Sequence, residues 1–329
     1  MLNLTRRNML AATAAAGAAA TLGLDPRTAG AAAPAATTQV PSVYRYKIGT
    51  MEVTVVSDGM RDAPLGQIVR NAPADEVAAA LEAAFLPKDK FPFVFNPSVV
   101  NTGSKLVVID TGNGPGAYAQ TKGQAGQMHT NLVAAGIDRA MVDLVIISHF
   151  HGDHINGLLT AEGTPAFPNA EVAVPEPEWA FWMSDDNMNK APEGLKAGFS
   201  NVRRVFKPLG DRVSRYGDKK ELAPGITSMF TPGHTPGHSS HVLASGGQSV
   251  VLQADVTNHP ALFVRNPGWH GTFDMDANVA EATRRRLYDQ LAADRSRLQG
   301  FHFPFPSNGY VEKDGNGYRF VAAQWSPVL

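Results

Sequence analysis

The stretch Ser148 to Leu158, SHFHGDHINGL, decides the fold prediction for this chain. It follows the apolar run Val142 to Ile147 (VDLVII), which predicts a buried strand. Four side chains then fall within six positions: His149, His151, Asp153 and His154. Imidazole nitrogen and carboxylate oxygen are common ligands of divalent zinc. The sequence therefore predicts a metal site directly behind this strand.

The spacing of these residues indicates two metal ions. His149 and His151 are two residues apart, so in an extended backbone their side chains leave on one face. Gly152 bends the chain, and Asp153 and His154 can then point to a second position. Paired metal ions lie roughly 3.5 to 4 Å apart and need ligand sets that diverge slightly. A lone histidine at a strand end is more commonly a surface or hydrogen-bonding residue, but the HxHxDH spacing favours metal binding.

The run HFHGDH at 149–154 resembles the signature of the metallo-β-lactamase-fold hydrolases. The other segments of that family's pattern follow in order, as TPGHTPGH at 231–238, LQADV at 252–256 and FHFPFP at 301–306. Within the family, the segment around residues 167–194 and the C-terminal GYVEKDGNGYRF resemble the methyl parathion hydrolase and lactonase-like group. The resemblance covers residues 43–329 and implies an α/β (α+β) fold, the four-layer αββα sandwich.

The resemblance also implies a complete ligand set. One metal ion would be held by His149, His151 and His234, the other by Asp153, His154 and His302, and Asp255 would bridge them. Asp153 and Asp255 would in addition be the catalytic carboxylates that handle the proton of the reaction. His238 and His241 are expected outside the ligand set.

Asp110, in the segment IDTG at 109–112, has two interpretations. Its side chain could cap the turn in which it lies. By resemblance, it would lie behind the metal site and orient a ligand histidine. In neither case would it bind the metal itself.

Composition narrows the possible functions. The chain has 329 residues, of which 43% have apolar side chains, so it can bury a large core. Its net charge is −1. Because no long basic run is present, we expect neither nucleic acid nor an anionic membrane surface as the main partner. The chain has no cysteine, so any metal must be held by His, Asp or Glu.

The N-terminus predicts export. Thr5-Arg6-Arg7-Asn8-Met9-Leu10 precedes an Ala/Gly-rich apolar run from Ala11 to Leu24, which is typical of a twin-arginine signal. A membrane anchor is the alternative, but the run is shorter than the roughly 20 apolar residues that a span needs. We therefore expect residues 1–36 to be signal and linker, residues 43–329 to be the hydrolase domain, and the protein to be periplasmic without a stable membrane anchor.

Several other segments carry structural predictions. Residues Pro73 to Leu86 predict a helix with Phe85 on its apolar face, and the glycine-rich residues 114–127 predict a loop. Residues 256–273 predict a loop over the site. A second helix is expected over Ala277 to Leu298, with its arginines, Arg284 among them, on a solvated face.

Aromatic residues near the ligand motifs are candidates for substrate binding. The run PEPEWAFWM at 175–183 offers two tryptophans, and by resemblance Trp182 rather than Trp179 would contact the substrate. Phe273, in the loop expected over the site, is the second candidate. The aromatic residues of the run at 175–183 could instead belong to the core, where aromatic side chains are common.

The predicted reaction is the hydrolysis of a neutral ester. Two divalent cations, for which we expect zinc, would lower the pKa of a shared water from 15.7 toward about 7 and give a hydroxide nucleophile. No cluster of Lys or Arg lies beside the ligand motifs, which favours an uncharged small-molecule substrate: a lactone, an aryl ester or an organophosphate triester. The resemblance also implies a homodimer.

Four alternatives remain open from the sequence. A glyoxalase II-like thioesterase would need basic residues for glutathione, and a β-lactamase would differ in its ligand set. A mononuclear iron oxidoreductase or a metal-storing protein would keep the fold and change the chemistry. The number and identity of the bound metals distinguish the last two from a hydrolase.

Overall fold

Two seven-stranded sheets organise the computed structural model, which describes residues 35–37 and 39–329. The order in the first sheet is β1-β2-β5-β6-β7-β8-β9. These strands are β1 (Val43–Ile48), β2 (Met51–Val56), β5 (Ser98–Asn101), β6 (Leu106–Ile109), β7 (Leu144–Ile146), β8 (Glu171–Pro175) and β9 (Val213–Tyr216). Strands β6 to β9 are parallel, and helices in their connections return the chain to the same edge.

The second sheet has the order β10-β11-β12-β13-β14-β15-β16. Its strands are β10 (Glu221–Ala223), β11 (Ile226–Phe230), β12 (Ser239–Ser245), β13 (Gln248–Leu252), β14 (Arg297–Gln299), β15 (Asn308–Asp314) and β16 (Gly317–Ala322). All neighbours are antiparallel except β13 and β14. The C-terminal segment GYVEKDGNGYRF forms the antiparallel hairpin of β15 and β16.

The sheets pack face to face over an apolar core. In β6, Val107 and Ile109 point toward the second sheet, where Ile226 and Leu252 belong to the same buried cluster. Val108 between them points to the opposite face and packs in a different cluster. Successive side chains of a strand alternate between faces, so strands that are covered on both sides are apolar throughout. This explains the uninterrupted apolar run that leads to the predicted metal site.

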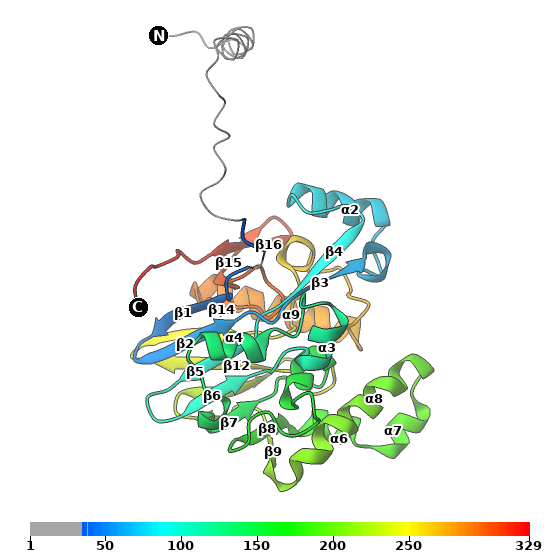
Figure 1. The fold of residues 1–329 in the computed structure, drawn as a ribbon. Helices are drawn as coiled ribbons and strands as arrows, with labels where there is room; N and C mark the ends of the chain where they lie inside the picture. The colour runs from blue at the N-terminus through cyan, green and yellow to red at the C-terminus, as the bar shows by residue number, and fades with distance from the viewer. Residues whose placement is uncertain (1–34, 38) are drawn as a thin grey trace, which may run out of the picture. The chain divides into compact units, whose positions relative to one another are not determined.

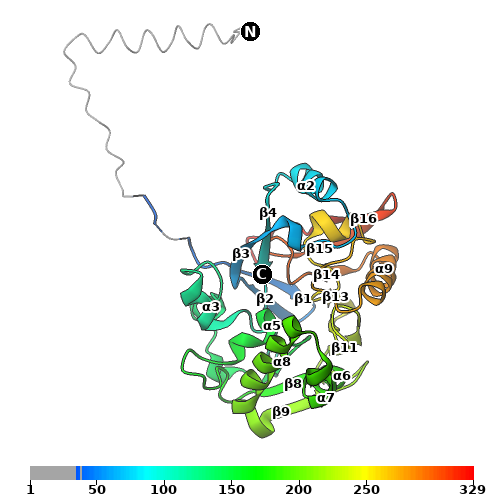
Figure 2. The same cartoon turned by 90° about the vertical axis from the view of Figure 1, so that its right-hand side faces the viewer.

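Helices cover the outer face of each sheet. On the first sheet these are α4 (Met128–Ala134), α5 (Gly152–Ile155), α6 (Glu176–Trp182), α7 (Asp185–Lys190) and α8 (Glu193–Phe206), with α6 to α8 together at the lower right of Figure 1. The second sheet is covered by α9 (Ala277–Asp294). Figure 2 shows α9 and α3 (Gly114–Gln120) on opposite sides of the strands. The predicted four-layer αββα sandwich is confirmed.

A smaller apolar cluster lies beside the sandwich. It joins the hairpin β3 (Gly59–Pro64) and β4 (Lys90–Phe95), the helix α2 (Ala74–Ala83) and a single-turn π-helix, Pro260–Val264. Phe93 and Phe95 of β4 belong to it, together with Phe301. Figure 1 shows α2, β3 and β4 together at the top of the sandwich. This cluster brings aromatic rings next to the loop that carries His302.

Two local predictions need correction. Helix α2 ends at Ala83, and Phe85 follows it with a φ of 58° and 98% exposure, so Phe85 is not on the buried face formed by Val77 and Leu81. The loop expected over residues 114–127 begins instead with helix α3. Gly114 is needed there for a close contact, because a Cβ at this position would lie 2.6 Å from the carbonyl oxygen of Asn156.

The remaining terminal and surface predictions have different outcomes. The predicted export signal and linker span residues 1–36, of which residues 1–34 lie outside the described residues, and Pro41–Leu329 form one structural unit. Among the residues that the structure describes, no helix combines the length and apolar character that crossing a bilayer requires.

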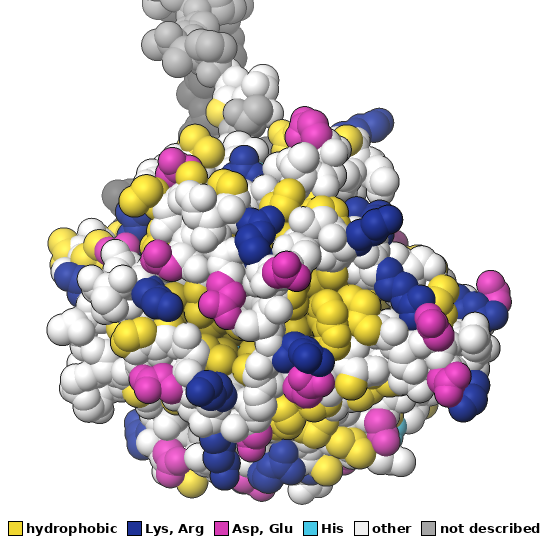
Figure 3. All heavy atoms as spheres, turned by 90° about the horizontal axis from the view of Figure 1, so that it is seen from below, with side chains coloured by type: hydrophobic (Ala, Val, Ile, Leu, Met, Phe, Trp, Pro, Cys, Tyr) yellow, Lys and Arg dark blue, Asp and Glu magenta, His cyan; other side chains and the backbone are white. Residues whose placement is uncertain are grey.

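On the face shown in Figure 3, acidic and basic side chains are interspersed with apolar ones, as expected from the near-zero net charge.

Candidate metal centre

The seven predicted ligands lie in loops at one edge of the two sheets. His149 and His151 follow β7, Asp153 and His154 lie in α5, His234 lies between β11 and β12, Asp255 follows β13, and His302 follows β14. The loops come from both sheets, so the sandwich itself brings them together. Among the described residues, three groups of ligating side chains form here: His149, His151 and His234; His149, His154 and Asp255; Asp153, His154 and His302.

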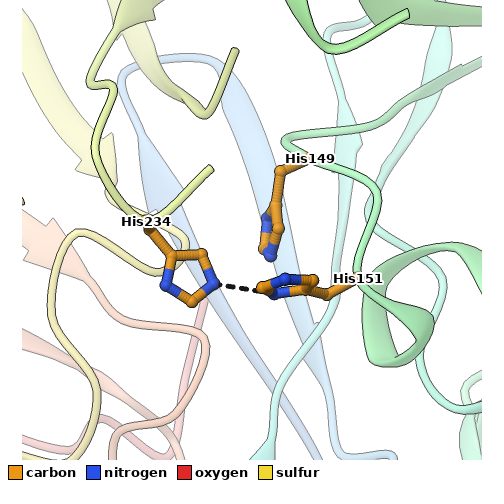
Figure 4. Close-up of side chains that lie close together, drawn as sticks. All are labelled: His149, His151 and His234. Atoms are coloured by element: carbon orange, nitrogen blue, oxygen red, sulfur yellow. Dashed lines mark hydrogen bonds between the residues drawn. The ribbon is translucent and has the colours of Figure 1, made fainter. Parts of the chain in front are cut away.

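The first group consists of three imidazoles. The ring centroids of His149 and His151 are 4.8 Å apart, and each lies within 4.7 Å of the ring of His234. Nδ1 of His151 is 2.9 Å from Nε2 of His234. Figure 4 shows the three rings arriving from two separate segments and facing one another. The arrangement matches the first predicted ligand set.

Asp255 lies between the first group and the second. Its Oδ1 is 3.2 Å from Nε2 of His154, and its Oδ2 is 3.0 Å from Nε2 of His302. The same Oδ2 is 3.4 Å from Nε2 of His234. Asp153 approaches the second group from the more open side, with Oδ2 at 3.5 Å from His302. The carboxylate of Asp255 therefore has the position expected of a bridging ligand.

Hydrogen bonds behind the rings fix which nitrogen of each imidazole faces the centre. Nδ1 of His154 contacts Oδ2 of Asp110 at 2.8 Å, Nδ1 of His234 contacts Oδ1 of Asp274 at 2.9 Å, and Nδ1 of His302 contacts the carbonyl of Val94 at 2.8 Å. Because these partners accept, each Nδ1 carries a proton, and each Nε2 faces the centre, where it is the nitrogen available to a metal.

The centre contains buried polar atoms without partners. Within the described part of the chain, Nε2 of His149, Nε2 of His154 and Oδ1 of Asp255 are buried and form no hydrogen bond. Leaving a buried polar atom unpaired costs about 1–3 kcal/mol. These three atoms lie in one cluster and are all electron-pair donors, so the residues fit divalent metal ions.

The electrostatics of His149, His151 and Asp255 agree with this fit. Burial lowers the pKa of His149 well below its ordinary value and that of His151 to about 3, so both rings are neutral at pH 7. Burial alone would raise the pKa of Asp255, but His302 and His154 beside it hold that pKa well below the usual range. Neutral imidazoles and ionised carboxylates are the protonation states in which these groups bind metals.

Asp110 has the orienting role that the resemblance implies. Its carboxylate contacts Nδ1 of His154 and accepts hydrogen bonds from the backbone N–H and the hydroxyl of Ser148, at 2.8 and 2.7 Å. The hydroxyl oxygen of Ser148 in turn lies 3.0 Å from Nδ1 of His149. Asp110 itself has a φ of 59°, a left-handed conformation. Its carboxylate contacts the ring of His154 directly and that of His149 through the hydroxyl of Ser148.

His238 and His241 lie outside the three ligating groups, as predicted. Nε2 of His238 accepts a hydrogen bond from the backbone N–H of Asp255 at 3.0 Å. Nε2 of His241 lies 3.1 Å from the hydroxyl of Tyr216. His238 thus supports the backbone of Asp255.

Asp274 and Arg284 support the site, and neither role could be predicted from the sequence. Asp274 contacts His234 with Oδ1, and its Oδ2 lies 3.4 Å from the guanidinium of Arg284. The prediction that Arg284 lies on a solvated face is wrong: its side chain is buried and also donates to the carbonyls of Val256, Pro267 and Trp269. An arginine that begins a run of three in a helix gives no sequence signal of such burial.

Glu178 is a second functional candidate that the sequence does not reveal. It is fully buried in α6, and its carboxylate accepts from the backbone N–H groups of Phe150 and Gly237 and from the indole of Trp182. Burial raises its pKa, and these donors oppose the shift. Its position four residues before Trp182, on a largely apolar helix, is the one signal that could have indicated burial.

The two predicted substrate contacts have different surroundings. Trp182 is only 1% exposed, and its Nε1 donates to Glu178, so it lies in the core behind His151 and does not offer a surface to a ligand. Its assignment as a substrate contact therefore needs correction. Phe273 is partly exposed, and its ring lies 5.7 Å from that of His234. Phe273 remains a candidate for contacting the substrate.

A family model described as the metallo-beta-lactamase superfamily matches residues 93–301. The chain belongs to this superfamily. The match spans the ligands from His149 to Asp255 and ends one residue before His302. The superfamily's fold is the four-layer sandwich described above, and the ligand loops lie at one edge of it.

Individual members of the superfamily resemble the chain to different extents. This chain is 31% identical over 121 residues to N-acyl homoserine lactonase AttM of Agrobacterium fabrum. The aligned region covers 33% of this chain and 39% of that protein. The match thus spans about two fifths of the relative's length. The structure of hydrolase AbOPH is similar with a TM-score of 0.80 and 26% identity, over 88% of this chain and all of that one. The dizinc quorum-quenching lactonase AidC has a TM-score of 0.81 at 24% identity, with the same coverage, and shares the fold.

Proposed function

We propose that this protein is a hydrolase that uses two divalent metal ions to cleave neutral esters. The observation that carries the proposal is that five imidazoles and two carboxylates converge on one place. Three of their nitrogen and oxygen atoms are buried there without a hydrogen bond. Two groups of donors with Asp255 in reach of both support a paired metal site over a single one. That arrangement favours hydrolysis over the mononuclear iron alternative.

Zinc is the metal that we propose for both positions. Imidazole and carboxylate ligands suit it, and the chain has no thiolate to offer. When bound, the two ions would acidify a water molecule and polarise the carbonyl or phosphoryl oxygen of the substrate. The first would be held by His149, His151 and His234, the second by Asp153, His154 and His302, with Asp255 shared.

Proton transfer falls to Asp153 in this proposal. Its side chain is 20% exposed, whereas that of Asp255 is 5% exposed and is directed at three imidazoles. A carboxylate at the open side of the centre can accept a proton from the attacking water and pass it to the leaving oxygen. Asp255 remains the second candidate for this role.

The preferred substrate class is a lactone, with aryl esters and phosphotriesters as alternatives. The identity to a lactonase over part of the chain supports a lactone. The rings of Phe93 and Phe273 lie 6.0 Å apart, and Phe93 lies 5.8 Å from His302. These two phenyl rings form an apolar side of the centre, which favours an uncharged substrate with an apolar group.

Localisation and assembly remain proposals from the sequence. The Arg6-Arg7 pair and the Ala-rich run after it support export to the periplasm by the twin-arginine route. The homodimer implied by the resemblance also stays a prediction. Cell fractionation with an Arg6→Lys, Arg7→Lys variant tests the first, and light scattering of the purified protein tests the second.

Metal content and substrate screening test the proposed function together. Metal-loaded protein is assayed on an acyl lactone, an aryl ester and a phosphotriester, beside His151→Ala and the control His129→Ala. His129 lies on α4 outside the ligating groups. We expect hydrolysis of at least one ester, loss of at least a hundredfold in His151→Ala, and retained activity in the control. Full activity of His151→Ala would overturn the proposal.

A further inference from the structure

One buried carboxylate connects the two loops that carry the first group of ligands. Oε1 of Glu178 accepts the backbone N–H of Phe150 at 3.0 Å, and Oε2 accepts that of Gly237 at 2.8 Å. Phe150 lies between His149 and His151, and Gly237 lies three residues after His234. Glu178 therefore accepts hydrogen bonds from the backbone between His149 and His151 and from the loop that carries His234.

The packing around Glu178 is close as well as polar. Gly237 approaches α6 so tightly that a Cβ at this position would lie 2.2 Å from the backbone nitrogen of Glu178. Trp182, one turn later in the helix, donates to the same Oε1 at 2.8 Å, and its ring lies against that of His151 with centroids 6.4 Å apart. Three donors surround the carboxylate, so its position is fixed.

The second group of ligands has other supports. His154 contacts Asp110, and His302 contacts the carbonyl of Val94. Glu178 accepts hydrogen bonds from the backbone N–H groups of Phe150 and Gly237 and from the indole of Trp182, and none of these residues neighbours His302. Among these supports, Glu178 contacts the loops of the first group and makes no hydrogen bond beside His302.

We infer that Glu178 is a positioning residue for one metal position, the one formed by His149, His151 and His234. The inference rests on the proposed function, because it presumes that the centre binds metals. Glu178 lies behind the backbone of the ligands and acts by holding two loops from different sheets at a fixed separation. Residues that orient ligands from behind typically contribute 10- to 100-fold to metal affinity.

Glu178→Gln is the direct test. The substitution keeps the size of the side chain but replaces one accepting oxygen with an NH₂ group, which cannot accept from both Phe150 and Gly237. Cobalt(II) serves as the probe, with affinities for both positions measured by chelator competition and the visible spectrum recorded at each step. His234→Ala and His302→Ala give the reference spectra for loss of the first and the second position. Glu176→Gln is the control, because Glu176 lies on the same helix and is exposed.

We expect the glutamine variant to bind one cobalt ion as the wild type does and the other 10- to 100-fold more weakly. With one ion bound, its spectrum should match that of His234→Ala and differ from that of His302→Ala. The control should bind both ions normally. Glu178→Asp retains the charge but is one methylene shorter, and the same selective loss is expected if the glutamine variant does not fold.

Two results would overturn the inference and leave the proposed function standing. One is unchanged affinity at both positions, which would make Glu178 a core residue only. The other is equal weakening at both, which would indicate general loosening. If the wild type itself does not bind two ions, the proposed function fails and the inference fails with it.

Discussion

Oδ1 of Asp274 lies 2.9 Å from Nδ1 of His234, at the side of the ring away from the metal centre. We expect Asp274→Asn to weaken metal binding at the position of His149, His151 and His234 by about 10- to 100-fold, because the amide no longer fixes the tautomer through a charged acceptor. Chelator competition measures the change. Asp294→Asn, an exposed position on α9, is the control. Equal affinities in the two variants would contradict the role of Asp274.

Arg284 is expected to contribute to stability through its buried guanidinium. It donates to the carbonyls of Val256, Pro267 and Trp269 and faces Asp274. Arg284→Met would leave these acceptors and a buried carboxylate unpaired, and we expect a loss of about 3–5 kcal/mol in the free energy of unfolding. Urea denaturation tests this, with the exposed Arg286→Met expected within about 0.5 kcal/mol of the wild type.

Asp58 gives a prediction for the dependence of stability on pH. This buried carboxylate accepts from the backbone of Asn113 and Met128, yet burial raises its pKa from 3.8 to about 6. The folded state therefore binds more protons than the unfolded chain between those values, and the contribution of Asp58 to stability falls as pH rises through this window. Above it, the loss is on the order of 3 kcal/mol.

Asp58→Asn removes this titration. The free energy of unfolding of the variant minus that of the wild type, measured on metal-free protein, should increase between about pH 4 and 6 and stay constant above. A difference that does not change over this interval would mean that the carboxylate has an ordinary pKa in the folded protein.

Phe273 and Trp182 should respond differently to substitution. Phe273→Ala removes a partly exposed ring beside His234, and we expect kcat/KM for an ester with an apolar group to fall roughly tenfold with a smaller loss of stability than Trp182→Phe. Trp182→Phe removes a buried indole N–H that donates to Glu178, so it should lower stability more than it raises KM. The reverse pattern would restore Trp182 as the substrate contact.

The candidate ligands could be brought together from the sequence because the segments that carry them follow apolar strands and occur in motifs with fixed spacing. His149, Asp255 and His302 lie far apart in the chain, but the strands before them end at one edge of the sandwich. The supports behind them could not be predicted in the same way. Asp274 is 40 residues from His234, and Glu178 is 59 residues from Gly237, so no local pattern connects the partners.

The local errors have a related cause. Gly114 lowers helix propensity, and only the contact with Asn156 explains why a helix begins there. Phe85 continues the spacing of Val77 and Leu81, but the chain leaves the helix before it. In each case tertiary contacts, or the end of an element, override the pattern that the sequence presents.

Anomalous diffraction from crystals grown with zinc tests the central claim most directly. The account predicts two peaks in each chain. The first should lie about 2.0–2.2 Å from Nε2 of His149, Nδ1 of His151 and Nε2 of His234, and the second at similar distances from Asp153, His154 and His302, with Asp255 touching both. A single peak, or peaks away from these seven side chains, would contradict it.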